Sequence, residues 1–156
     1  MSEARSGLGF DVHRFSEQRA LWLGGVRFED EDGLLGHSDG DVVCHAVADA
    51  FLGAAALGDL GQHFPDTDPA VAGIEGRTLL QRVVERVSAA GFRAASVDAT
   101  VICDRPTIAP RREEMREALA KAIGIDVDRV SVKATRPEGL GLAGDGVGCL
   151  AIVVVT

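Results

Sequence analysis

A carboxylate and an imidazole lie two residues apart near the start of the chain, at Asp11 and His13. The segment 7–13 alternates in a way that predicts a β-strand, in which every second side chain points to the same face. Asp11 and His13 would then share a face about 6–7 Å apart, with Phe10 and Val12 on the other. Such a pair can give two ligands to one metal ion, but taken alone the pattern is weak and favours a surface or capping role.

A second polar group follows helical spacing. Asp41, His45 and Asp49 are four residues apart, which places them on one stripe of an otherwise small and apolar helix. A histidine in a mostly buried helix needs partners for both ring nitrogens, so His45 is either a hydrogen-bonded core residue or a metal ligand. With Asp11 and His13 it would leave a fourth tetrahedral position open, as in a catalytic zinc site, although manganese or cobalt would also suit these ligands.

The other histidines have different settings. Ser38 is predicted as the N-cap of this helix and Gly58 as its end, which places His37 just before the N-terminus. That position favours a phosphate or another anion to which His37 could donate; the alternative is an exposed ring beside the cap. His63 lies in a long loop, 58–75, and is predicted to be a solvated loop residue, although loops of that length are usually functional.

Apolar periodicity and turn residues define the elements that must position these groups. We expect strands at 7–13, 21–28, 94–103, 130–135 and 149–155, and helices at about 38–58, 76–90 and 111–123. This order favours a single α+β domain over residues 1–156. The expected architecture is a mixed or antiparallel sheet of about four main strands, with helices packed on one face and a small β-hairpin in addition.

Composition narrows the class of protein. The chain has 156 residues, a net charge of −8 and 46% hydrophobic residues, which is typical of a globular domain and argues against a nucleic-acid-binding protein. It has no apolar run long enough for a membrane span and no signal-peptide features at its start. Cys44, Cys103 and Cys149 lie in apolar stretches and are predicted to be buried reduced thiols of a cytoplasmic protein.

These residues lie within longer motifs that are specific in order and spacing. The motifs are Gly9 to Phe15, Gly36 to His45, Gly58 to Pro69, Arg105-Pro106 and Val132 to Gly141. On them the chain resembles, nearly from end to end, the 2-C-methyl-D-erythritol 2,4-cyclodiphosphate synthases of the non-mevalonate isoprenoid pathway. The resemblance implies a phosphorus–oxygen lyase that cyclises the cytidine diphosphate substrate 4-diphosphocytidyl-2-C-methyl-D-erythritol 2-phosphate and releases CMP.

The resemblance also implies the assembly and the cofactors. It implies a homotrimer with the sheets around the three-fold axis and the active sites between subunits. Asp11, His13 and His45 match the ligands of Zn²⁺ or another divalent transition metal, and Glu138 matches a ligand of a second ion, Mg²⁺ or Mn²⁺, near the substrate diphosphate.

Further positions match the family's catalytic and substrate-binding residues. The matched catalytic residues are His37, Thr135, Arg136 and Glu138. The residues matched to the phosphates, methylerythritol and ribose are Asp11, His13, His37, Ser38, Asp49, Asp59, Leu60, Gly61, Phe64, Pro65, Asp66, Thr67 and Asp68. The remaining substrate-binding residues, mainly of a cytosine pocket expected to read the base through backbone groups, are Cys103, Asp104, Arg105, Pro106, Thr107, Ala109 and Leu142.

A few positions depart from the family pattern. Arg136 replaces a threonine assigned to transition-state stabilisation and precedes a stiff Pro137, although an arginine can itself stabilise phosphoryl charge. Thr107 replaces a lysine, and Leu142 replaces a phenylalanine. Asp145 replaces an arginine of the trimer's central cavity, so three carboxylates should repel the isoprenoid diphosphates that some members bind there.

Three functions therefore stay open. The first is an active cyclodiphosphate synthase, which the retained His37, His45 and Glu138 favour. The second is a non-catalytic, metal-binding trimeric relative with an altered Arg136 loop. The third is a zinc-dependent phosphohydrolase that uses the open metal position for water.

Overall fold

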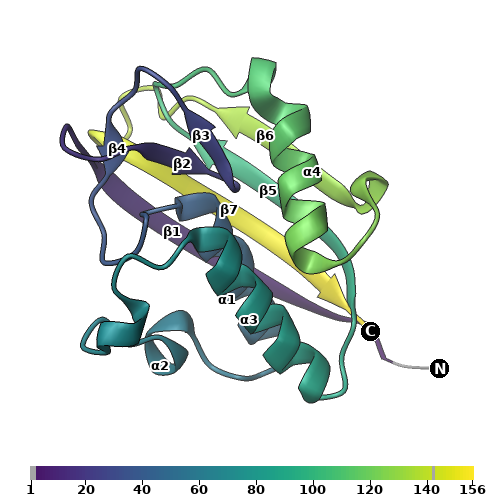
Figure 1. Cartoon of the computed structure of the whole chain (residues 1–156). Helices are drawn as coiled ribbons and strands as arrows, with labels where there is room; N and C mark the ends of the chain where they lie inside the picture. Colours follow the sequence, from purple (N-terminus) through teal and green to yellow (C-terminus); the bar gives the residue numbers. More distant parts are fainter. Residues whose placement is uncertain (1–2, 142) are drawn as a thin grey trace.

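The computed structural model describes residues 3–141 and 143–156, so Leu142 lies outside the described residues. The chain forms a mixed sheet with its helices on one face (Figure 1). In chain order the elements are β1 (Arg5–Ser16), β2 (Leu21–Leu23), β3 (Val26–Phe28), β4 (Gly33–Leu34), α1 (Val42–Ala54), α2 (Leu60–His63), the 3₁₀ helix η1 (Pro69–Val71), α3 (Gly76–Ala89), β5 (Ala94–Ile102), η2 (Ala109–Arg111), α4 (Arg112–Ile123), η3 (Val127–Arg129), β6 (Val130–Thr135) and β7 (Gly146–Val155).

The main sheet has the strand order β4-β1-β7-β5-β6. Only β5 and β6 pair in parallel, through the connection that contains α4, and the other neighbours are antiparallel. The two-residue β4 is a short addition at the edge, so the predicted α+β architecture with four main strands is confirmed. The prediction missed the length of β1 and β7, which pair from Arg5↔Val155 to Arg14↔Gly146.

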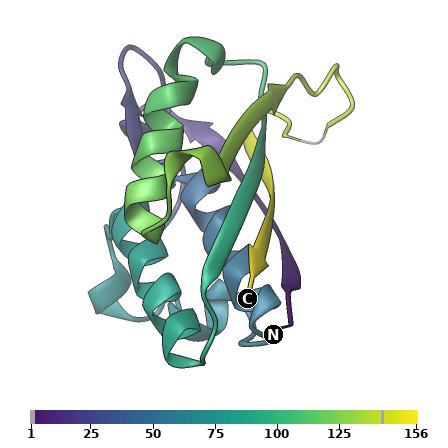
Figure 2. The same cartoon turned by 90° about the vertical axis from the view of Figure 1, so that its right-hand side faces the viewer.

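The two faces of the sheet differ. Figure 2 shows α1, α3 and α4 on one side of the sheet, where they cover the buried core. The other side of β1 and β7 carries apolar side chains that remain exposed, namely Leu8, Phe10, Val12, Leu150 and Ile152. Within the described residues, no helix has the length and apolar character needed to cross a bilayer.

The segment predicted as one strand over 21–28 is instead the small hairpin, with β2 and β3 joined by Gly24 and Gly25. Both glycines have positive φ, 62° and 77°, which a two-residue turn between antiparallel strands requires and other residues rarely adopt. The turn was missed because the residues of β2 and β3 show the same alternation of buried and more exposed side chains, which is also expected of a single strand.

Helix α1 begins later than predicted, because Asp41 rather than Ser38 caps it. The buried carboxylate of Asp41 accepts from the N–H groups of Val43 and Cys44 at 3.2 and 3.0 Å, and from those of the hairpin glycines at 2.8 and 2.7 Å. The helix also ends at Ala54 rather than Gly58. The prediction that His37 and Ser38 directly precede the helix N-terminus is therefore wrong, and Asp41 serves as cap and hairpin anchor.

Candidate metal centre and substrate cavities

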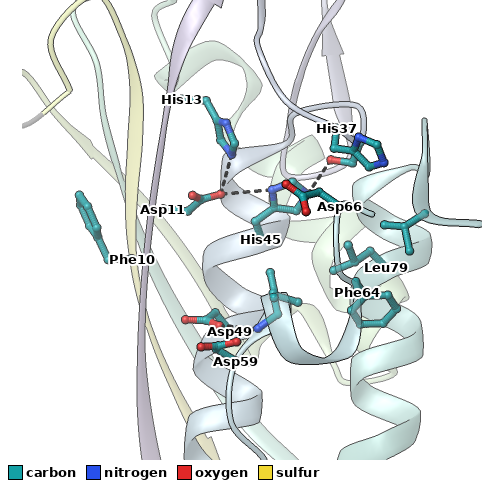
Figure 3. A pocket seen from close by; sticks show the side chains of 14 residues that line it. Phe10, Asp11, His13, His37, His45, Asp49, Asp59, Phe64, Asp66 and Leu79 are labelled. Carbon is teal, nitrogen blue, oxygen red and sulfur yellow. Dashed lines mark hydrogen bonds and ion pairs between the residues drawn. The ribbon is translucent and has the colours of Figure 1, made fainter. Parts of the chain in front are cut away.

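Three potential metal ligands from β1 and α1 meet at one point. The Oδ2 atom of Asp11 lies 2.9 Å from Nε2 of His13 and 3.2 Å from Nδ1 of His45 (Figure 3). One ligand atom from each of the three residues lies within 4.8 Å of the others, and His45 is buried while the other two are partly buried. Phe10 points away from this group across the strand, as the alternation of β1 predicts.

Close backbone packing brings β1 to α1. A Cβ atom on Gly7 would lie 1.9 Å from the Ala50 carbonyl oxygen, and one on Gly9 would lie 1.9 Å from that of Ala46. Only glycine therefore allows the strand to approach the helix so closely. Because side chains alternate along β1, the face that carries these glycines also carries the two strand ligands.

Each histidine has a second hydrogen bond that fixes its ring. His13 Nδ1 lies 2.7 Å from the carbonyl oxygen of Leu35, and His45 Nε2 lies 3.0 Å from Oγ of Ser38. When Nδ1 of His13 carries the proton, its N–H donates to the Leu35 carbonyl oxygen and Nε2 is left as the ligand atom. This arrangement is usual for metal-binding histidines. Two ligand atoms on a tetrahedral zinc lie about 3.3 Å apart. The three side chains therefore fit such an ion.

The same contacts shift the ionisation of the group. Burial opposes the charged form of Asp11, but the hydrogen bonds and charges of His13 and His45 hold its pKa well below the ordinary value. The hydrogen bond to Asp11 in turn raises the pKa of His13. Asp11 therefore stays an anion, while a metal that binds His13 competes with a proton below the raised pKa of His13.

A cavity of about 380 Å³ opens beside this group. On the side of β1 and α1 it is lined by Phe10, Asp11, His13, His45 and Asp49, together with His37 and Ser38 from the loop before α1. Its opposite wall comes from the predicted loop, which contains α2, and consists of Asp59, Leu60, Gly61, Phe64 and Asp66. Asp49 joins the two sides, because its Oδ1 accepts from the Leu60 N–H at 3.0 Å.

The lining leaves out three of the predicted substrate-binding residues of this loop. Pro65 and Thr67 are exposed beside the wall, and Asp68 caps η1 by accepting from the Ala70 N–H at 2.9 Å. The prediction for His63 is wrong: its ring is held by the carbonyl oxygen of Leu57 at 2.7 Å and by Nη1 of Arg86 at 2.7 Å. The only signal in the sequence was a basic residue on the next predicted helix, Arg86, that could donate to the ring of His63.

A separate cavity of about 250 Å³ lies at the ends of β5 and β6. Its lining contains most of the predicted cytosine-pocket residues and two predicted catalytic ones, namely Cys103, Asp104, Pro106, Thr107, Ala109, Thr135 and Arg136. Burial raises the pKa of the Cys103 thiol to about 11, so this thiol is protonated at neutral pH. All three cysteines are free and buried, as predicted.

Two residues assigned to that region lie elsewhere. Arg105 donates to Asp32 at 3.1 Å, and its guanidinium carbon lies 4.0 Å from the ring centroid of Phe15, so it holds the loop rather than lining the cavity. Glu138 is exposed and lies outside the lining of both cavities. Sequence reasoning missed Arg112, which lines the second cavity with a buried Nε that has no hydrogen-bond partner among the described residues.

The fold and this site define an α+β protein with a ligand group of one aspartate and two histidines beside a cavity lined by both polar and apolar side chains. The chain matches the YgbB family over residues 4–156 and belongs to it. It is 53% identical over 151 residues to a 2-C-methyl-D-erythritol 2,4-cyclodiphosphate synthase of Trichlorobacter lovleyi. This match covers 97% of this chain and 96% of that protein.

Longer relatives contain the same unit. A bifunctional enzyme IspD/IspF of an Anaeromyxobacter species is 55% identical over 148 residues, and the match covers 95% of this chain but 38% of that protein. Among solved structures, the bifunctional IspDF from Campylobacter jejuni superposes with a TM-score of 0.93 at 39% identity, over 98% of this chain and 42% of that one. A 2C-methyl-D-erythritol-2,4-cyclodiphosphate synthase in its CDP-bound form has a TM-score of 0.90 at 35% identity, over 97% of this chain and 100% of that one.

Proposed function

We propose that this chain, acting as one domain over residues 1–156, is a 2-C-methyl-D-erythritol 2,4-cyclodiphosphate synthase in isoprenoid precursor synthesis. The substrate is 4-diphosphocytidyl-2-C-methyl-D-erythritol 2-phosphate. An oxygen of its 2-phosphate bonds to the β-phosphorus, the bond from that phosphorus to the oxygen shared with the α-phosphate breaks, and CMP leaves with that oxygen. The observation that carries the proposal is the Asp11, His13 and His45 group beside the 380 Å³ cavity, together with the names of the relatives.

The ligand group suits Zn²⁺ or another divalent transition metal, which when bound supplies Lewis-acid stabilisation of phosphoryl charge. Glu138 is proposed as a carboxylate ligand of a second ion, Mg²⁺ or Mn²⁺. Its exposure leaves the carboxylate free to meet a substrate diphosphate.

The protein's part in this reaction is to hold the substrate folded back on itself. The nucleophile belongs to the substrate, so positioning and charge neutralisation account for most of the catalysis. His37 and Ser38 are proposed to bind phosphate and methylerythritol at one side of the first cavity. The opposite wall and Asp49 are proposed to bind the methylerythritol and ribose. Thr135 and Arg136 are proposed to stabilise the phosphoryl charge from the second cavity.

A homotrimer would join the two cavities into complete sites. In one chain the two linings share no residue, yet both sets are proposed to bind one substrate. The exposed apolar residues on the open face of β1 and β7, such as Phe10 and Ile152, supply a surface for neighbouring subunits around a three-fold axis. Light scattering should give the mass of three chains, and the double variant Phe10→Asp, Ile152→Asp should lose both that mass and turnover.

The central experiment is incubation of the purified protein with substrate, Zn²⁺ and Mg²⁺, followed by ³¹P NMR. CMP and a cyclic diphosphate are expected. Release of inorganic phosphate would instead indicate a phosphohydrolase, and an unchanged substrate would indicate a non-catalytic relative.

The free buried thiols also support the predicted cytoplasmic location. Binding of isoprenoid diphosphates at Asp145 is still not expected, and calorimetry with geranyl diphosphate tests it.

A further inference from the structure

The wall of the first cavity formed by residues 58–66 needs outside support. Its only helix, α2, has four residues, and a helix that short does not persist in water by itself. At its start this wall is fixed to α1 through Asp49. We propose that Arg86 and His63 fix its other end and are positioning residues for substrate binding, an inference that rests on the proposed function.

The ring of His63 connects two parts of the chain. With its proton on Nε2, the neutral imidazole donates to the Leu57 carbonyl oxygen at 2.7 Å. Its Nδ1 then accepts from Nη1 of Arg86, also at 2.7 Å. Both ring nitrogens are thereby used, and the end of α2 is joined to the residue before the wall and to helix α3.

Arg86 also contacts the residue that reaches the cavity. Its guanidinium carbon lies 5.1 Å from the ring centroid of Phe64, within the range of a cation–π contact. Phe64 is 9% exposed and lines the cavity, as does Leu79 of α3; both are labelled in Figure 3. One side chain of α3 therefore holds two consecutive residues, His63 through a hydrogen bond and Phe64 through its ring.

These contacts lie apart from the metal ligands. Asp11, His13 and His45 are held by β1, α1, Leu35 and Ser38. Among the described residues, Arg86 has no hydrogen bond or ion pair with the three ligands, Leu35 or Ser38. Loss of the Arg86 contacts should therefore loosen the wall and leave the ligand group in place. The consequence is weaker substrate binding with little change in the rate of the bound substrate's reaction.

The test compares Arg86→Met with Arg82→Met in the full-length protein. Arg82 is exposed one turn earlier on α3 and has no hydrogen bond or ion pair with the described residues, so it is a matched control. Loss of the Arg86 contacts should raise KM about tenfold and leave kcat within about twofold. Amide exchange over 58–66 should accelerate about tenfold in the protein without substrate. Arg82→Met should change none of these, and Arg86→Lys should lie between.

His63→Ala should reproduce part of the effect, because it removes the hydrogen bond to Arg86 but leaves the contact of Arg86 with Phe64. The double variant with Arg86→Met should be less impaired than the sum of the two single effects, because both variants remove the His63–Arg86 hydrogen bond. Unchanged exchange over 58–66, or a fall in kcat at constant KM, would overturn the proposal. If the wild-type protein does not turn over substrate, the proposed function fails. The exchange measurement then still decides whether Arg86 holds the wall.

Discussion

The two cavities of this chain are built in different ways. The ligand group at the first cavity comes from a long strand and a buried helix, and every ligand ring has a second hydrogen bond. The second cavity is lined mainly by loop residues between β5 and α4 and by the end of β6, and its two arginines, Arg112 and Arg136, have no ion-pair partner among the described residues. All three residues of the ligand group come from one chain, whereas the second cavity presents two arginines without an ion-pair partner among the described residues.

Under the proposed function, this difference separates the residues that would bind the metal from those that would contact the substrate phosphates. Rigid elements hold the group that must keep ligand atoms about 3 Å apart. The groups proposed to meet the substrate phosphates in the second cavity, Thr135 and Arg136, are the last residue of β6 and the residue after it. Substitutions in the first region should therefore act on metal content and folding, and substitutions in the second on turnover alone.

The largest effect is expected from His45→Ala, which removes the ligand that α1 contributes. Turnover should fall about a thousandfold or more, since a metal supplies several kcal/mol of charge stabilisation. Metal analysis should show less than one equivalent of zinc, while light scattering should still give the wild-type mass. Zinc should restore chelator-treated wild-type protein but not the variant. Full activity of the metal-stripped variant would contradict the metal assignment.

Gly9→Ala tests whether close strand–helix packing assembles the first region. The added Cβ would lie 1.9 Å from the Ala46 carbonyl oxygen, so the strand has to move away. We expect a loss of about 3 kcal/mol in the free energy of unfolding and weaker zinc binding. Gly53→Ala is the control, because its nearest contact would be the Leu8 carbonyl oxygen at 4.0 Å, and it should be neutral or stabilising by up to about 1 kcal/mol. Equal denaturation curves for both variants would contradict this account.

Arg136→Ala tests the second region. A charge-assisted contact to a phosphoryl group is worth about 1.5–3 kcal/mol, so kcat should fall between about tenfold and a hundredfold. The zinc content and the unfolding curve should match those of the wild type, because Arg136 is exposed at the end of β6. A variant that lost its metal would show that the two regions are not independent.

The pH dependence of metal binding gives the most gradual effect, since no residue is changed. The pKa of His13 is raised by its hydrogen bond to Asp11, so below that pKa the metal competes with a proton. Asp11 adds no such competition near neutral pH, since its pKa is lowered. Zinc affinity should therefore rise with pH, by up to about tenfold per unit, and level off above the His13 pKa. Calorimetry between about pH 5.5 and 8.5 checks this; an affinity that does not change with pH would contradict it.

Local patterns predicted the parts of the molecule that regular elements determine. The alternation around Asp11 and His13 and the apolar spacing around His45 predicted β1 and α1, and placed three potential ligands on facing elements. The patterns alone left their role open, and the family resemblance selected them as metal ligands. The open apolar face follows from the same alternation, because Leu8, Phe10 and Val12 occupy the other side of the strand.

The errors arose where tertiary contacts decide the outcome. The start of α1 depends on whether Asp41 or Ser38 reaches the free N–H groups, and the hairpin glycines that share the Asp41 carboxylate are remote in sequence. The ring of His63 is held by a residue of the next helix, and Arg105 is drawn away from its cavity by Phe15 and Asp32. Helical or strand periodicity contains no information on such contacts.

The glycines of β1 have a consequence for how the ligand group can change over time. At Gly7 and Gly9 the separation between strand and helix is set by main-chain atoms rather than by side chains. Substitutions among apolar core residues elsewhere can therefore accumulate during evolution without altering the spacing of the ligands. A single methyl group added at either glycine, in contrast, would displace β1 from α1 and so change the spacing of all three ligands. The spacing of the three ligands therefore depends on these two glycines more than on the identity of the surrounding core residues.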